Sequence, residues 1–170
     1  MREGPSPCGV SGPACDGRRY VVPGDVVVTG SVVGQYVCAL FHSKTTESAG
    51  FLLRSELAFK PMAAAMPQGA WIGTWRDGDD EITLRAAGTA LAVTGYAFWP
   101  SAAPSEYQSS PHLGEVSGTA RPVSNTVVFA GKSVDDCRVS LTLLPPYLLA
   151  RDNRQCGGMN VSFTGVYRKG

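Results

Sequence analysis

Apolar and polar residues alternate with a period of two along much of the second half of the chain. The clearest runs each place one apolar set on a single face: Cys137, Val139, Leu141 and Leu143 in the first, and Met159, Val161, Phe163, Gly165 and Tyr167 in the last. Such alternation is typical of strands with one buried face. Turn-forming pairs separate the runs: Ala87-Gly88, Ser124-Asn125, Pro145-Pro146 and Gly157-Gly158. The pattern predicts an antiparallel sandwich or closed barrel of about eight strands over residues 71–170.

The first half of the chain shows β-branched and aromatic runs between residues 19 and 59. They read YVVPGDVVVTG, SVVGQYVCALF and GFLLRSELAF, with turn residues such as Pro23-Gly24-Asp25 and Gly30 among them. These runs predict three or four short strands. Residues 60–70, KPMAAAMPQGA, break the pattern with small residues and two prolines, which predicts a linker with room for about one helical turn at Met62–Met66. The chain is therefore expected to be all-β, with an N-terminal extension (1–18), a small domain (19–59), a linker and a larger β domain.

Charge and hydropathy narrow the class of protein. Charged residues make up 17% of the chain and the formal net charge is +1, which argues against a nucleic-acid-binding protein. No apolar run approaches the roughly 18 residues that cross a bilayer. The N-terminal stretch MREGPSPCGV lacks the apolar core of a secretory signal. Either the protein is cytosolic or an export signal has been removed.

The five cysteines favour the exported alternative. They show neither a C-x-x-C pair nor nearby histidines, so disulfides are a better interpretation than a zinc site. A bridge between Cys137 and Cys156 stabilises a small β domain by about 3 kcal/mol on the entropic model, and two buried free thiols are the alternative. Cys38 lies in a strand-like run, where burial or a bridge to Cys15 or Cys8 is expected. Because five is odd, at least one N-terminal cysteine is unpaired or pairs between chains.

Residues 19–59 resemble the bacterial SH3-like domain, a small β-barrel of secreted and cell-wall-associated proteins. The resemblance lies in the order of a strand, Gly-Asp, a strand, Gly34-Gln35-Tyr36, a variable turn at 42–50, and Gly50-Phe51 followed by Ser55-Glu56-Leu57. Both aromatic positions that the family usually carries are present. The resemblance implies a location at the cell envelope.

The region from Gly69 to Lys169 resembles a β domain of secreted proteobacterial proteins, some of which carry it behind a region related to lysozyme-inhibitor families. The motifs are the opening WIGTW, the central HLGEVSGTA and the closing DNRQCGGMNVSFTGVYRK. The resemblance implies a periplasmic or lipoprotein-like setting. The Ser-Gly-x-x-Tyr loop of c-type lysozyme inhibitors is not matched, because Ser117-Gly118 is followed by Thr119, Ala120 and Arg121.

Few residues suggest catalysis. His112 and Glu115 could form an acid/base pair in a loop, with Ser109 or Ser110 as nucleophile, but a G-x-S-x-G elbow is missing. The acidic stretch RDGDDEIT at 76–83 could hold Ca²⁺, yet its spacing differs from an EF-hand loop, and Asp-Gly between two strand runs favours a hairpin turn. We expect no metal site and no cofactor.

Aromatic residues are stronger candidates for binding. A stacking platform for a sugar ring or a partner side chain could be built from Trp71, Trp75, Tyr96, Phe98 and Trp99. Trp71 and Trp75 are four residues apart and face the same way in an extended strand, so at least one belongs to the core. The longest loop follows Trp99. We place partner contacts there, at Trp99, Tyr107, His112 and Glu115.

These observations predict a periplasmic or secreted binding protein without enzymatic activity. The expected partner is a cell-wall hydrolase, which the protein could inhibit, or peptidoglycan itself; no nucleic-acid partner and no transmembrane segment are expected. Two alternatives remain open. One is a small hydrolase that uses His112 with Glu115, and the other is a structural module of an envelope assembly.

Overall fold

The computed structural model describes residues 20–42, 47–60, 65–100, 111–133 and 135–170. The chain divides into two compact units, Met1–Lys60 and Pro61–Gly170. The described residues form eleven strands, one turn of 3₁₀-helix and one turn of α-helix. The predicted all-β class is therefore confirmed.

The first unit contains a three-stranded antiparallel meander, in the order β1-β2-β3. Its elements are β1 (Val27–Val33), β2 (Tyr36–His42), β3 (Glu47–Leu53) and the 3₁₀ turn η1 (Arg54–Glu56). Gly34 has a φ of +59°, a left-handed conformation that suits glycine in the two-residue turn between β1 and β2. Val37, Ala39 and Leu52 are buried on one face of the meander, and Tyr36 is buried on the other. Membership of the SH3-like family stays a prediction, because many small β folds contain such a meander.

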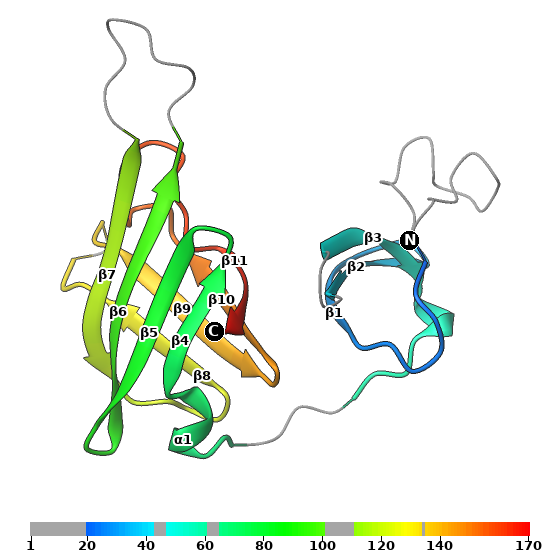
Figure 1. The fold of residues 1–170 in the computed structure, drawn as a ribbon, viewed down its shortest axis with the longest axis horizontal. Coiled ribbons are helices and arrows are strands. Elements are labelled where there is room, and N and C mark those ends of the chain that lie inside the picture. The colour runs from blue at the N-terminus through cyan, green and yellow to red at the C-terminus, as the bar shows by residue number, and fades with distance from the viewer. Residues whose placement is uncertain (1–19, 43–46, 61–64, 101–110, 134) are drawn as a thin grey trace, which may run out of the picture. The chain divides into compact units, whose positions relative to one another are not determined.

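The second unit is a nearly closed barrel of eight antiparallel strands. Two four-stranded meanders, β4–β7 and β8–β11, join where β11 pairs with β4, which gives the order β7-β6-β5-β4-β11-β10-β9-β8. Figure 1 shows the first meander in green and the second in yellow to red, around a common interior. The strands are β4 (Gly73–Asp77), β5 (Asp80–Ala87), β6 (Ala90–Trp99), β7 (His112–Ala120), β8 (Thr126–Ala130), β9 (Arg138–Leu144), β10 (Tyr147–Asp152) and β11 (Gly165–Lys169).

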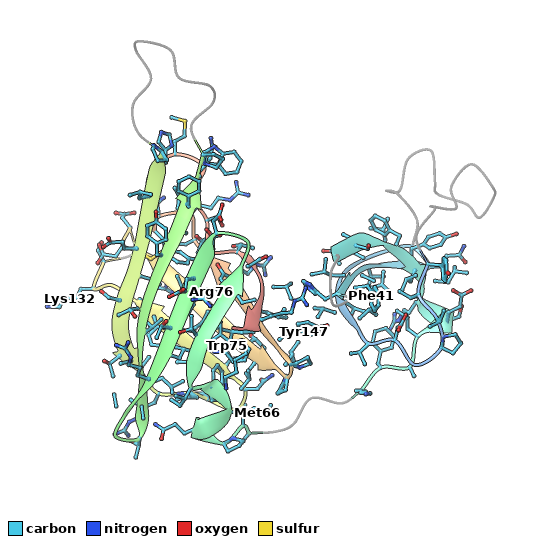
Figure 2. The ribbon with its side chains drawn as sticks, viewed as in Figure 1. Phe41, Met66, Trp75, Arg76, Lys132 and Tyr147 are labelled. Carbon is cyan, nitrogen blue, oxygen red and sulfur yellow. A yellow bond between two sulfur atoms is a disulfide. The ribbon has the colours of Figure 1, made fainter. Side chains whose placement is uncertain are left out.

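Alternation along the strands fills the barrel with large apolar side chains. In β9 the residues Val139, Leu141 and Leu143 are buried, as the sequence pattern predicts. Figure 2 labels Trp75 and Arg76, successive residues of β4. Trp75 is 2% exposed, whereas the Arg76 side chain is 56% exposed, because neighbouring residues of a strand point to opposite faces.

A single helical turn, α1 (Gln68–Trp71), lies at one end of the barrel (Figure 1). The Gln68 amide Nε2 donates to the carbonyls of Gly88 and Ala90 at 2.9 and 2.8 Å, which ties α1 to the β5–β6 turn. Trp71 is fully buried, and its carbonyl accepts a hydrogen bond from Trp75 Nε1 at 2.9 Å. The prediction that both tryptophans share one extended strand is wrong, because Trp71 ends α1. Both are interior, so neither belongs to an exposed platform.

The connection between β10 and β11 corrects the predicted last strand. β11 begins only at Gly165, and Met159 is 74% exposed while Val161 and Phe163 are buried. The Asp152 carboxylate binds residues of this connection in place of a neighbouring strand. It accepts hydrogen bonds from Ser162 Oγ, Phe163 N and Thr164 Oγ1 at 2.9, 2.9 and 3.1 Å. These bonds replace strand pairing for residues that the alternation alone assigned to a strand.

The predicted disulfide between Cys137 and Cys156 is confirmed. It anchors the β10–β11 connection beside the start of β9. The connection then pairs with the free edge of β7: Glu115 N donates to the Cys156 carbonyl at 3.0 Å, and Gly158 N donates to the Leu113 carbonyl at 3.1 Å. A Cβ on Gly157 would lie 2.5 Å from Gly114 Cα, so glycine is needed for this approach.

The N-terminal cysteines are only partly described. Cys38 on β2 is half-buried and forms no disulfide with another cysteine of the described residues. Its predicted partners Cys15 and Cys8 lie outside the described residues, so the predicted pairing is untested.

Candidate functional site

The pairing of β6 with β7 gathers aromatic and apolar residues at one end of the barrel. The register sets Trp99 opposite His112 and Phe98 opposite Leu113. Trp99 is 47% exposed and Leu113 is 48% exposed, although both are large apolar side chains. Residues paired across neighbouring strands lie about 4.5–5.5 Å apart at Cβ, so Trp99 neighbours His112 on the inward face of the strand ends and Phe98 neighbours Leu113 on the outer face.

The β10–β11 connection extends this apolar surface. The Met159 carbonyl lies 2.6 Å from Nδ1 of His112. Met159 itself is 74% exposed. We give the name rim patch to the apolar residues at this end of the barrel: Trp99 from the inward face of the strand ends, Leu113 and half-buried Phe98 from the outer face, and Met159 from the connection. Exposed apolar residues gathered from three separate segments mark an interaction surface more strongly than single exposed residues do.

His112 and Glu115 do not form the acid/base pair that the sequence suggested. Both lie in strand β7 rather than in a loop. An odd separation of three residues in a strand directs the two side chains to opposite faces. His112 shares the inward face with buried Gly114 and Val116, whereas Glu115 is exposed on the outer face. Ser109 and Ser110, the suggested nucleophiles, lie outside the described residues.

A second feature is a shallow hollow on the outer face of β5, β6 and β7. Its volume is about 300 Å³, and its lining residues are Glu81, Thr94, Gly95, Tyr96, Glu115, Val116 and Ser117. The register places Glu81 opposite Tyr96 and Tyr96 opposite Glu115, so the phenol lies between two carboxylates. Arg76 Nη2 donates to Glu81 Oε2 at 2.7 Å, and Thr83 Oγ1 donates to Glu81 Oε1 at 3.4 Å. We call this feature the outer hollow.

The acidic stretch 76–83 forms the turn between β4 and β5, which confirms the turn interpretation. Two of its carboxylates hold neighbouring strands: Asp77 Oδ2 accepts from Val166 N at 3.0 Å, and Asp80 Oδ1 accepts from Phe98 N at 2.8 Å. Within the described part of the chain, no group of three or more His, Cys, Asp or Glu residues is arranged to hold a metal ion. Asp77 and Asp80 therefore stabilise the fold.

Asp80 gives the barrel a measurable pH response. Burial raises the pKa of Asp80 above its ordinary value of 3.8; the Phe98 N–H opposes this rise, and the charges of Asp77 and Asp79 add to it. A raised folded-state pKa means that the folded protein binds the proton more tightly than the unfolded chain does. The contribution of Asp80 to stability is therefore largest below its unfolded pKa and is lost as the pH rises through the folded pKa.

We therefore expect wild type to gain stability relative to Asp80→Asn as the pH falls from about 7 to about 3. Urea unfolding of both proteins across this range measures the difference, in which the titration of groups that do not interact with Asp80 cancels. The expectation is contradicted if the difference in the free energy of unfolding between the two proteins does not change with pH. It is also contradicted if wild type loses stability relative to Asp80→Asn as the pH falls.

The structure brings together part of the predicted site. Trp99 and His112 face each other, while Glu115 lies on the outer face, and Tyr107 lies outside the described residues. The sequence analysis missed Leu113, Met159, Glu81, Thr94 and Ser117. Leu113 and Glu115 share one face by the alternation of HLGEVSG, so this signal could have been found. The sequence contains no such signal for Met159, because the position of this residue beside His112 depends on the path of the β10–β11 connection.

Comparison with known proteins found no match. No protein-family model, no curated protein and no solved structure matches the chain. Among the residues that the structure describes, no helix is long and apolar enough to span a membrane.

Proposed function

We propose that the protein is a non-enzymatic binding protein of the bacterial cell envelope, and that the rim patch is its binding surface for a protein partner. The observation that carries the proposal is the exposure of Trp99, Leu113 and Met159 at one end of a barrel with a well-packed interior. Large apolar side chains left in water at one place are a feature of docking surfaces, and tryptophan is a frequent hot-spot residue.

The envelope location is supported by the disulfide. The Cys137–Cys156 bridge is of a kind that forms and persists in oxidising compartments such as the periplasm. The resemblance to secreted proteobacterial proteins points in the same direction. We take a cell-wall hydrolase as the partner class, and peptidoglycan as the competing ligand that the experiment must separate.

The experiment compares immobilised wild type with a rim variant that carries Trp99→Ala, Leu113→Ser and Met159→Ser. We expect wild type to retain a specific protein from a proteobacterial envelope extract and the rim variant to lose it, since removal of a hot spot weakens binding by about 2 kcal/mol or more. A matched control is Val128→Ser on β8, which replaces another 45% exposed apolar residue away from the patch. The captured protein is then purified and its affinity for all three forms is measured by calorimetry.

Three outcomes contradict the proposal. The first is equal capture by wild type and the rim variant. The second is sedimentation of wild type with purified peptidoglycan without any protein partner. The third is hydrolysis of a cell-wall substrate by the purified protein.

The structural-module alternative uses the same patch. An apolar surface also suits a permanent neighbour in an envelope assembly, because obligate interfaces are more apolar than transient ones. The lifetime of the captured complex separates the two: a permanent neighbour stays bound through gel filtration, whereas an inhibitor-like partner exchanges with added free protein.

A further inference from the structure

We propose that the outer hollow binds a cationic side chain, an arginine or a lysine, presented by the partner that covers the rim patch. The identity of the partner rests on the proposed function. The chemistry of the hollow rests on its own residues and can be tested separately.

The first step is the order of charges along one row of the sheet. Arg76, Glu81, Tyr96 and Glu115 are successive cross-strand neighbours on β4, β5, β6 and β7. Arg76 pairs with Glu81 at 2.7 Å and offsets its charge. No basic side chain of the described residues pairs with Glu115. The row therefore ends in an uncompensated carboxylate beside an aromatic ring.

The second step is the chemistry of that pair. Tyr96 is 41% exposed and lies directly opposite Glu115. A cation placed over a phenol ring is attracted to its π face, and a neighbouring carboxylate adds an ion pair. The barrel itself contains a related contact, since Lys169 Nζ lies 5.3 Å from the centre of the Trp75 ring. The hollow offers a similar aromatic contact to a group from outside the chain.

The third step is the position of the hollow next to the rim patch. Tyr96 and Phe98 are two residues apart on β6, and Glu115 and Leu113 are two apart on β7. Residues two apart in a strand share a face, so the outer-face part of the rim patch, Phe98 and Leu113, continues directly into the hollow. A partner that covers Leu113 also covers Glu115. Removal of water under such a partner strengthens the attraction between Glu115 and a cation, which favours a partner with a basic residue beside an apolar surface.

The test uses small probes and the whole chain. N-acetyl-arginine methylamide is titrated into ¹⁵N-labelled protein, and the amide shifts of Thr94–Tyr96 and Glu115–Ser117 are followed. The matched probe is N-acetyl-citrulline methylamide, which has nearly the same shape without the charge. N-acetylglucosamine tests the competing interpretation that the tyrosine and the hydroxyls of the hollow bind a sugar.

We expect the arginine probe to shift these amides and the citrulline probe to shift them much less. Glu115→Gln should reduce the initial slope of the amide shift against arginine-probe concentration about threefold. Added salt should reduce the same slope in wild type. Tyr96→Phe should retain the response because it keeps the ring, and Tyr96→Ala should lose it. The control Glu56→Gln on η1 makes the same charge change in the other unit and should respond like wild type. The dispersion of the ¹⁵N–¹H spectrum checks that each variant is folded.

Equal shifts from the arginine and citrulline probes overturn the proposal, as does a wild-type response in Glu115→Gln. Shifts of these amides by N-acetylglucosamine alone replace it with a sugar site. Failure of the proposed function gives a different result. In that case the rim variant captures the same proteins as wild type, while the arginine probe still binds the hollow.

Discussion

Replacement of Phe163 by alanine is expected to lower the free energy of unfolding of the barrel by about 3–5 kcal/mol. Phe163 is fully buried although it lies outside the named strands. Its ring packs against the backbone of β6 at Gly95, where a Cβ would lie 3.2 Å from Phe163 Cε1. Truncation removes this contact and leaves a cavity that the hydrogen-bonded backbone cannot fill. Urea unfolding followed by tryptophan fluorescence measures the loss.

The control for this prediction lies four residues earlier. Met159→Ala changes a residue that is 74% exposed in the same connection, so we expect a change within about 0.5 kcal/mol. All three tryptophans of the chain lie between residues 71 and 99, so the fluorescence signal reports on the barrel. A loss from Phe163→Ala no larger than that from Met159→Ala contradicts the packing of this connection into the core.

Removal of the disulfide by Cys137→Ser with Cys156→Ser is expected to cost about 3 kcal/mol, because a bridge across a loop of this size restricts the unfolded chain. The two cysteines are 19 residues apart. A second effect acts in the folded state. Without the bridge, the β10–β11 connection is held against β7 only by packing and hydrogen bonds. These bonds include Glu115 N to the Cys156 carbonyl and Gly158 N to the Leu113 carbonyl. Urea unfolding measures the loss.

Reduction provides the matched control for the disulfide. Wild type in excess reductant should lose about as much stability as the double variant, and the double variant should not respond to reductant. Because β7 carries Leu113 and Glu115, hydrogen exchange at these amides should also accelerate in the double variant. A double variant as stable as oxidised wild type contradicts the role of the bridge.

The fold class followed from local patterns. Alternation in CRVSLTLL placed Val139, Leu141 and Leu143 correctly on the buried face of β9. The Asp-Gly turn between β4 and β5 and the Pro145-Pro146 turn between β9 and β10 were also recognisable, since both depend on residues next to each other in the chain. Alternation failed over residues 159–164, because the Asp152 carboxylate takes hydrogen-bond donors that a ladder would otherwise use.

The candidate site was predicted only in part. The loop after Trp99 predicts partner contacts that include Trp99 and His112, and strand pairing places these two residues opposite each other. The alternative of an acid/base pair of His112 with Glu115 requires a loop, where side-chain direction is not fixed, but both residues lie in β7. Because HLGEVSG forms a strand, the separation of three residues places the side chains of His112 and Glu115 on opposite faces.

The sequence by itself determined that this protein is built from short strands and that Cys137 can bridge to Cys156, because residue spacing decides side-chain faces and turns. Only the tertiary structure decided that the strands close into a barrel and that Met159 lies beside His112. It also decided that Tyr96 stands between Glu81 and Glu115. These facts depend on which distant segments pair, and pairing is chosen by the burial of the whole core rather than by any local stretch of the chain.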